Sequence, residues 1–148
     1  MPYYYFDSTA LVKRYSRERG SRIVNSLMTK REKTIIVGGP TITEFYALFA
    51  LKAREGQLTR DDWYSVLFKF EAESARGVYH FATPTSETFT ATKQLLLDYP
   101  VLRAPQAVHL MLAYEFRSLR LSVVSTDRQI LELCKPLGMN PINPEEDE

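Results

Sequence analysis

The sequence has one cysteine and no long hydrophobic run, and both absences limit the kind of protein it can be. Cys134 is the single cysteine in 148 residues, so no disulfide can form within one chain. No segment approaches the roughly 18 consecutive apolar residues of a membrane helix. The start, MPYYYFDST, lacks the basic segment and the long apolar core of a signal peptide. We therefore expect a protein of the reducing cytoplasm with no membrane partner.

The sequence also lacks an excess of charge of either sign. Its 19 Lys and Arg residues nearly cancel its 18 Asp and Glu residues, which leaves a formal net charge of +1. Domains that attract nucleic acid through their overall charge usually have a strongly basic composition. Any attraction to phosphate groups must therefore be local.

The length and the apolar content predict one domain. A chain of 148 residues with 45% hydrophobic residues can bury most of its apolar surface in a single core. We place this domain at residues 1–144. Residues 145–148 form a short acidic tail with too few apolar side chains to pack, and we expect it to fray or to lie on the surface.

Short apolar runs alternate with segments whose apolar residues recur at helical spacing. We predict strands at 3–6, 34–37, 78–81 and 121–125, and helices at 10–17, 21–29, 41–55, 59–75, 86–99, 105–117 and 127–135. This alternation predicts a three-layer α/β/α sandwich with a central, mostly parallel sheet. In such sheets a functional site lies outside the carboxyl ends of the strands.

Three acidic residues are expected at that edge of the sheet. Asp7 follows the first strand, Glu44 lies near the start of the helix after the second, and Asp127 follows the strand at 121–125. Carboxylates held close together repel each other unless a cation lies between them. Hard divalent ions such as Mg²⁺ or Mn²⁺ bind through oxygen ligands and can activate a water for attack on phosphorus. The three acids together therefore favour metal-dependent phosphodiester hydrolysis.

Each of these acids also has an ordinary structural role available. Asp7 and Asp127 are at positions where an aspartate commonly caps the following helix. The segment from Thr41 to Glu44 matches a capping box, in which the glutamate bonds back to the first amide of its helix. Taken singly, each acid fits its structural role better, and only the combination favours a metal site.

Several motifs resemble those of PIN-domain proteins, especially the VapC-type toxins of toxin–antitoxin pairs. The segment YFDSTALVKRY at 5–15 resembles the family's opening, and TEF at 43–45 resembles its second acidic motif. LRAPQAVHL at 102–110 and STDR at 125–128 resemble the third and fourth motifs, and LGMNPINP at 137–144 resembles the usual tail. The four motifs occur in the family's order and span nearly the whole chain.

This resemblance implies a function and a set of site residues. It implies that Asp7, Glu44 and Asp127 are catalytic residues and metal ligands, with Thr9 and Ser125 as the hydroxyl residues beside them. The implied activity is Mg²⁺- or Mn²⁺-dependent cleavage of RNA by a toxin. The implied partners are a cognate antitoxin protein and a second copy of the chain, as a homodimer.

The third motif departs from the family's pattern because Gln106 stands where an aspartate is usual. An amide oxygen can coordinate a metal or a bound water, but it brings no charge, and Mg²⁺ affinity depends on carboxylates. We expect weaker metal binding and a single-metal or inactive site. Asp98 lies eight residues upstream, at a predicted helix end that gives no reason to place it in the cleft.

His109 shares a helix face with Gln106, three residues away. A histidine at this place could act as a general acid or base. We favour the alternative that it packs beneath the site and bonds a backbone carbonyl or a neighbouring strand.

Local cations and aromatic residues suggest where partners bind. Lys13, Arg14 and Arg128 are candidate contacts to RNA phosphates, although a solvated helix face explains the first two equally well. The predicted helices at 41–55 and 59–75 are rich in aromatic residues, and core packing is the default for most of them. Helices apolar on more than one side could also present a surface for a second subunit or an antitoxin peptide.

Two other functions remain as alternatives. A catalytically inactive PIN-like module that binds RNA or protein is favoured by Gln106 and by the modest charge. A phospho-receiver-like regulator also uses acids at strand ends. The sequence lacks the paired acids beside the first strand and a convincing late lysine, so we rank this regulator last.

Overall fold

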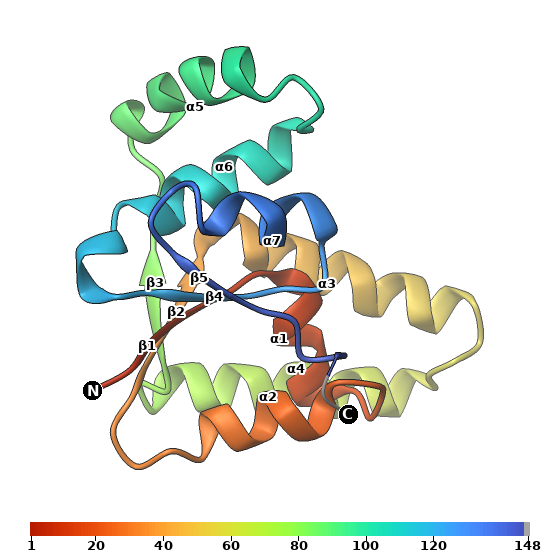
Figure 1. Cartoon of the computed structure of the whole chain (residues 1–148). Coiled ribbons are helices and arrows are strands. Elements are labelled where there is room, and N and C mark those ends of the chain that lie inside the picture. Colours follow the sequence, from red (N-terminus) through yellow and green to blue (C-terminus); the bar gives the residue numbers. More distant parts are fainter. Residues whose placement is uncertain (147–148) are drawn as a thin grey trace.

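The protein, whose structure is a computed structural model describing residues 1–146, has one parallel sheet at its centre (Figure 1). The strands are β1 (Tyr3–Phe6), β2 (Thr34–Gly38), β3 (Tyr79–Ala82), β4 (Ser122–Val124) and β5 (Asn140–Ile142). They lie in the order β3-β2-β1-β4-β5, and every neighbouring pair is parallel. The helices are α1 (Ser8–Tyr15), α2 (Ser21–Met28), α3 (Gly39–Arg54), α4 (Arg60–Ala75), α5 (Ser86–Asp98), α6 (Ala104–Tyr114) and α7 (Arg128–Cys134), with a 3-10 turn at Arg117–Leu119.

Helices cover both faces of this sheet because its strands are apolar on both sides. Along β1, Tyr4 and Phe6 pack into a core with Phe45 and Phe49 of α3, whereas Tyr5 points to the opposite core. Figure 1 shows α5, α6 and α7 on one side of the sheet and α1, α2 and α4 on the other. The expected three-layer α/β/α sandwich is confirmed. In the described part of the chain, no helix has the length and apolar character needed to span a bilayer.

The structure adds a strand that the sequence analysis missed. β5 lies at the sheet edge, where Val123 of β4 is in register with Pro141. Proline has no backbone N–H to donate, so it fits an edge strand, and this short Pro-containing segment gave no strand signal. The helix predicted at 105–117 is also shorter, since α6 ends at Tyr114. Arg120, after the 3-10 turn, takes a left-handed conformation with φ 55°.

The start of α3 differs from the expected capping box. Gly38 is the N-cap, without a side-chain hydrogen bond, and Pro40 lies in the first turn, where a missing N–H costs nothing. Thr41 is already inside the helix, and its buried hydroxyl has no hydrogen-bond partner among the described residues. The capping-box interpretation of Glu44 is therefore wrong, and the Glu44 side chain is available for another contact.

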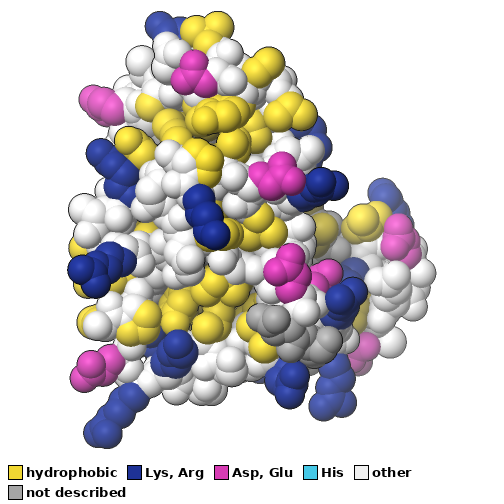
Figure 2. All heavy atoms as spheres, in the orientation of Figure 1, with side chains coloured by type: hydrophobic (Ala, Val, Ile, Leu, Met, Phe, Trp, Pro, Cys, Tyr) yellow, Lys and Arg dark blue, Asp and Glu magenta, His cyan; other side chains and the backbone are white. Residues whose placement is uncertain are grey.

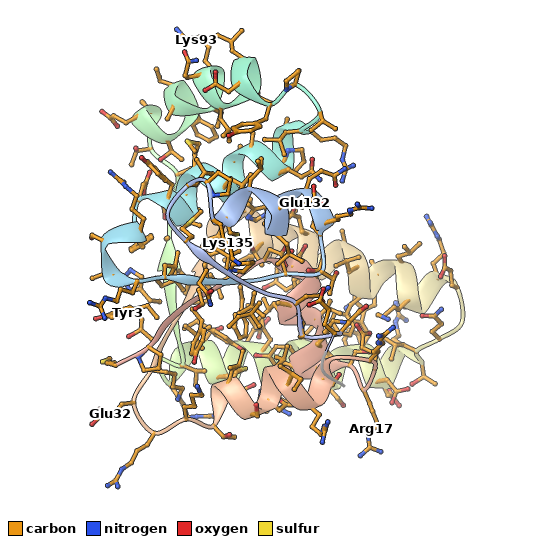
Figure 3. All side chains as sticks on the ribbon, viewed as in Figure 1. Tyr3, Arg17, Glu32, Lys93, Glu132 and Lys135 are labelled. Atoms are coloured by element: carbon orange, nitrogen blue, oxygen red, sulfur yellow. The ribbon has the colours of Figure 1, made fainter. Side chains whose placement is uncertain are left out.

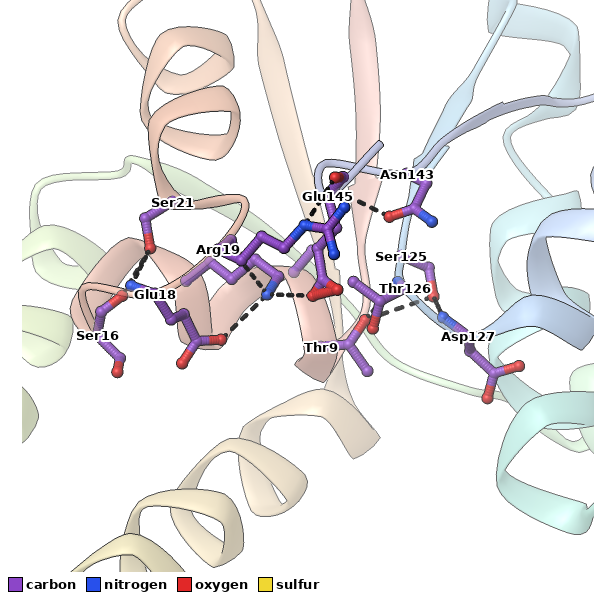
Figure 4. Close-up of polar contacts among 12 residues, drawn as sticks. Thr9, Ser16, Glu18, Arg19, Ser21, Ser125, Thr126, Asp127, Asn143 and Glu145 are labelled. Carbon is purple, nitrogen blue, oxygen red and sulfur yellow. Dashed lines mark hydrogen bonds and ion pairs between the residues drawn. The ribbon is translucent and has the colours of Figure 1, made fainter. Parts of the chain in front are cut away.

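The beginning of the acidic tail is bound to the fold. Lys13, only 4% exposed, donates from Nζ to Glu18, to the carbonyl of Arg19 and to Oε2 of Glu145 at 2.9 Å (Figure 4). Arg19 also donates to the Glu145 carbonyl. The structure thus ties Glu145 to the turn between α1 and α2. Residues 147 and 148 lie outside the described residues, and the loose tail expected there stays a prediction.

The strand order creates a crevice at one edge of the sheet. β1 and β4 are neighbours, and the sheet extends from β1 toward β2 but from β4 toward β5. Where the chain leaves two adjacent parallel strands in opposite directions, a crevice opens outside their carboxyl ends. Asp7 follows β1 and Asp127 lies just beyond β4, so the fold itself directs both residues to this crevice.

We predict that Gly38→Ala destabilises the protein by about 1–3 kcal/mol, because a Cβ at this position overfills the core. It would lie 2.4 Å from the Tyr5 hydroxyl oxygen and 2.7 Å from Cδ2 of Leu112. Gly39→Ala is the matched control, since its Cβ would meet no atom closer than 3.7 Å. Urea unfolding measures both variants, and equal stability of the two would contradict this packing argument.

Candidate metal-binding cleft

The three predicted acids line one cleft at the crevice between β1 and β4. Asp7, Glu44 and Asp127 surround it together with Gln106 and His109, and its volume is about 170 Å³. They come from the start of α1, from α3 and from the start of α7. The topology therefore brings together side chains that are up to 120 positions apart in the sequence.

Asp7 is the most buried of the three acids. It caps α1 through a hydrogen bond from the Ala10 amide to Oδ1 at 3.1 Å. Thr9 donates to the same oxygen at 2.6 Å, and Ser125 donates to Oδ2 at 2.5 Å. Burial raises the pKa of Asp7, and the hydrogen bonds from Ser125 and Thr9 oppose this effect. The capping role and a place in the cleft therefore coexist in one residue.

The hydroxyls of Thr9 and Ser125 join the two loops that carry the acids. Ser125 Oγ accepts from the Asp127 amide at 2.9 Å, and Thr9 Oγ1 accepts from the Thr126 amide at 2.8 Å. Each hydroxyl also donates to Asp7, so each uses its donor and an acceptor position. These bonds fix the start of α1 against the start of α7.

Gln106 contacts the cleft through its amide nitrogen. Its Oε1 accepts from the Arg103 backbone amide at 2.8 Å, which orients the side chain. Its Nε2 then donates to Asp127 Oδ1 at 3.0 Å and to Oδ2 at 2.9 Å. Asp127 also caps α7 by accepting from the Ile130 amide. The Gln106 oxygen, which we considered as a metal ligand, instead accepts a hydrogen bond at the start of α6. The NH₂ group of Gln106 donates to both oxygens of Asp127.

Glu44 is held by a histidine on the opposite helical layer. His109 Nε2 lies 2.6 Å from Glu44 Oε1, and His109 Nδ1 lies 2.8 Å from the Tyr5 hydroxyl. The buried position of His109 and its contact to Tyr5 of the strand β1 agree with the interpretation that it packs beneath the site, whereas the contact to the Glu44 side chain was not expected. Sequence reasoning missed Tyr5, because a tyrosine within an aromatic strand is most often a core residue.

The donor chemistry of the cleft fits a hard cation, but a three-carboxylate cage is not preformed. Within residues 1–146, no three His, Cys, Asp or Glu side chains are grouped so that they could hold a metal ion. Mg²⁺ usually keeps several waters and binds proteins through one or two carboxylates. A partly hydrated ion therefore suits a cleft whose acids come from separate elements.

The other predicted residues lie away from the cleft or are bound within the fold. Arg14 donates to both oxygens of Glu73, and Lys13 donates to Glu18 and Glu145. Arg128 is exposed and pairs with Glu132 at 2.8 Å. Asp98 accepts from Gln94 on the exposed surface of α5 and does not line the cleft.

A second, larger hollow of about 480 Å³ lies beside the carboxyl end of α1 and the start of α2. Five of its lining residues are cations and one is an acid: Lys13, Arg14, Arg17, Arg22, Lys69 and Glu18. Arg17, Arg22 and Lys69 are exposed, and within residues 1–146 none of them has an ion-pair partner. Figure 3 shows Arg17 extending away from the body of the molecule. The chain thus has a local basic surface despite its nearly neutral total.

Comparisons with known proteins place this fold. A scan of protein-family models found no match, and neither did a search of curated proteins. PAE2754 from Pyrobaculum aerophilum matches with a TM-score of 0.61 and 16% identity, over 95% of this chain and 83% of that one. VapC20 from Mycobacterium tuberculosis, described as a sarcin-ricin loop cleaving toxin, matches with a TM-score of 0.60 and 9% identity. The match covers 86% of this chain and 92% of that one.

The fold is PIN-like. The order of motifs led us to expect this architecture, and the parallel sheet and the structural matches confirm it. At these low identities the likeness concerns the fold alone. The roles of individual residues in this PIN-like fold must be argued from its own cleft.

We predict that the difference in stability between Asp7→Asn and the metal-free wild type depends on pH, because the wild type alone has an ionisable group at this buried position. Asparagine can still accept from the Ala10 amide, but its NH₂ group cannot accept the hydrogen bond that Ser125 donates to Oδ2. Because the folded-state pKa of Asp7 is raised, the carboxylate destabilises the fold above that pKa. This penalty disappears below the pKa of an unfolded aspartate, about 3.9.

The measurement is urea unfolding of both proteins at several pH values in the presence of a chelator. The stability of Asp7→Asn relative to the wild type must decrease as the pH falls through the raised pKa of Asp7 and toward about 3.9. A stability difference that stays constant from neutral to acid pH would contradict the assigned cost of burying this charge.

Proposed function

We propose that this protein is a metal-dependent endoribonuclease, the toxin of a toxin–antitoxin pair, whose metal binding is weakened by Gln106. One observation carries the proposal: Asp7, Glu44 and Asp127 come from three separate elements and line one cleft at the carboxyl edge of a PIN-like sheet. Acids gathered in this way suit a divalent cation far better than they suit a packed core.

Mg²⁺ or Mn²⁺ bound in this cleft would supply a water activated for attack on phosphorus and would stabilise the negative charge that develops on the phosphate. Asp7 and Glu44 are the proposed direct ligands, because the third acid, Asp127, already accepts hydrogen bonds from the Gln106 amide at both of its oxygens. Thr9 and Ser125 hold the Asp7 carboxylate in a fixed orientation. Asp127 contributes its negative charge beside the cleft, where Gln106 binds its oxygens.

We predict that Gln106→Glu raises the affinity for Mn²⁺ about tenfold and raises RNA cleavage. Glutamate has the same shape, so it can still accept from the Arg103 amide. It places an oxygen instead of an NH₂ group against Asp127, and the repulsion between two carboxylates is relieved by a cation. Calorimetry with Mn²⁺ and a cleavage assay on single-stranded RNA measure the two effects.

Gln57→Glu is the matched control, because it adds the same charge at an exposed position outside the cleft. Equal Mn²⁺ affinities of the two variants would contradict the role given to Gln106. The Gln106→Asp variant restores the residue that is usual in the family, and it tests whether the length of the acid matters.

The basic hollow is the proposed path of the RNA backbone. Lys13 and Arg14 are largely neutralised by Glu18, Glu145 and Glu73, so the free charges are those of the other cations there. We predict that replacing Arg17, Arg22 and Lys69 together by Gln weakens RNA binding. It should also reduce the slope of log affinity against log salt by about 2, since each lost phosphate contact to a single strand contributes about 0.7.

Binding is measured with a chelator present, so that no RNA is cleaved. Replacing Arg31, Lys93 and Lys135 by Gln is the matched control, because these exposed cations lie outside the hollow. Figure 3 shows Lys93 on α5, far from Arg17. If the two triple variants lose affinity equally, RNA is attracted by total charge and the proposed path is wrong.

An antitoxin and a second copy of the chain are the proposed protein partners in the cytoplasm. Tyr46 on α3 and Tyr64 and Phe68 on α4 are exposed, and Phe68 is 75% exposed. Figure 2 shows positive and negative side chains interspersed on the face in view, so this face offers no broad surface of a single charge. The apolar α3–α4 surface is therefore the better candidate for both partners. A small open reading frame directly upstream of the gene would support the antitoxin.

A catalytically inactive module that binds RNA is the second candidate. It is favoured by one observation, that the amide of Gln106 and the imidazole of His109 already bind two of the three acids without a cation. This candidate predicts that RNA binding survives Asp7→Asn and that neither the wild type nor Gln106→Glu cleaves RNA with Mn²⁺.

A further inference from the structure

A chain of hydrogen bonds crosses the molecule beneath the cleft. It begins at Tyr5 on β1, continues through His109 on α6 and ends at Glu44 on α3. Tyr5 is 0% exposed and His109 is 4% exposed, whereas the Glu44 side chain is 32% exposed and reaches the cleft. The chain therefore connects a fully buried phenol to the carboxylate of Glu44, a partly exposed residue that lines the cleft.

The direction of these hydrogen bonds follows from Tyr5. Tyr5 is 0% exposed, and a tyrosine phenol, with an ordinary pKa of about 10, carries its proton at neutral pH. The phenol therefore keeps its proton and needs an acceptor in the protein interior. Within the described residues, the hydrogen-bond partner of its hydroxyl is Nδ1 of His109, at 2.8 Å.

The tautomer of His109 is fixed by this contact. A ring whose Nδ1 accepts from Tyr5 carries its proton on Nε2. That N–H then donates to Oε1 of Glu44 at 2.6 Å. Both ring nitrogens are thus hydrogen-bonded, and the Tyr5 end of the chain is a phenol without access to solvent. His109 has neither a free nitrogen for substrate nor a route that could carry protons to water through Tyr5.

The backbone at Gly38 leaves space for the Tyr5 hydroxyl that contacts His109. Gly38 ends β2 and caps α3, and a Cβ at this position would collide with the Tyr5 hydroxyl. The same helix carries Glu44, so the residue that makes space for the phenol also starts the element that presents the carboxylate. Rings of Tyr5 and His109 meet edge to face, with centroids 6.0 Å apart, which further restricts the imidazole.

We propose that Tyr5 and His109 are positioning residues that orient the Glu44 carboxylate for a hard divalent cation. This inference rests on the proposed function, because it assigns Glu44 as a ligand. A glutamate side chain has several freely rotating bonds and loses this freedom when it binds a metal. Hydrogen-bond partners that orient metal ligands in advance typically change metal affinity about 10- to 100-fold when they are removed.

The first test measures Mn²⁺ affinity by calorimetry in variants that keep or remove the donor. His109→Leu removes it, and we expect affinity to fall at least about tenfold. His109→Gln replaces Nε2–H by an amide N–H, and we expect most of the affinity to be retained. Tyr5→Phe leaves the aromatic ring in place but removes the hydroxyl that selects the His109 tautomer. We expect a loss of Mn²⁺ affinity between those of the other two variants. Unfolding curves must show that each variant folds.

Tyr79→Phe is the matched control for Tyr5→Phe. Tyr79 is also a buried tyrosine whose hydroxyl bonds another side chain, Tyr15, and it does not line the cleft. We expect its removal to leave Mn²⁺ affinity unchanged. If Tyr5→Phe and Tyr79→Phe behave alike, the role of the Tyr5 hydroxyl is overturned.

The second test needs no metal. Nitrogen NMR of the His109 ring should show an unprotonated Nδ1 and a protonated Nε2 in the wild type, and a mixture in Tyr5→Phe. A ring protonated at Nδ1 would overturn the inference. Equal Mn²⁺ affinities of the wild type and His109→Leu would overturn it while leaving the nuclease proposal intact. A wild type with this tautomer that binds no Mn²⁺ would overturn the proposed function, and with it the role given to this pair.

Discussion

The fold depends on satisfying three carboxylates that its own topology places at one edge of a parallel sheet. Asp7, Glu44 and Asp127 cannot share a cleft without partners, because a buried or crowded charge is costly unless it is hydrogen-bonded or paired. The chain meets this requirement with a different donor for each acid: hydroxyls for Asp7, an imidazole for Glu44 and an amide for Asp127. Each acid of the cleft therefore has a hydrogen-bond partner within the protein.

These donors also connect the helical layers. Glu44 lies on α3, which packs on one face of the sheet, and its partner His109 lies on α6, which packs on the other. Gln106, one turn earlier on α6, reaches Asp127 at the start of α7. Asp7 and Asp127 cap helices and also line the cleft. For these two residues, a capping role therefore does not exclude a place in the cleft.

The sequence predicted the parts of this protein that depend on local patterns. Apolar runs ended by Asp7 and by Ser125 to Asp127 located two neighbouring strand ends, because strand periodicity and capping residues are local signals. The capping box at Glu44 failed because Pro40 sets the helix start earlier, and β5 was missed because Pro141 interrupts a segment of three residues. The contacts of Gln106 and Tyr5 could not be predicted, since they depend on which way a side chain turns after packing. Whether the gathered acids bind a metal stays a prediction.

The most direct measurement is a crystal structure of the protein soaked in Mn²⁺, with the ion located by its anomalous scattering. The account predicts one Mn²⁺ in the cleft, coordinated by Asp7 or Glu44 together with waters, while Gln106 remains bonded to Asp127. It would be contradicted by a cleft that stays free of Mn²⁺ at saturating concentration, or by an ion that binds only at surface acids away from the sheet edge.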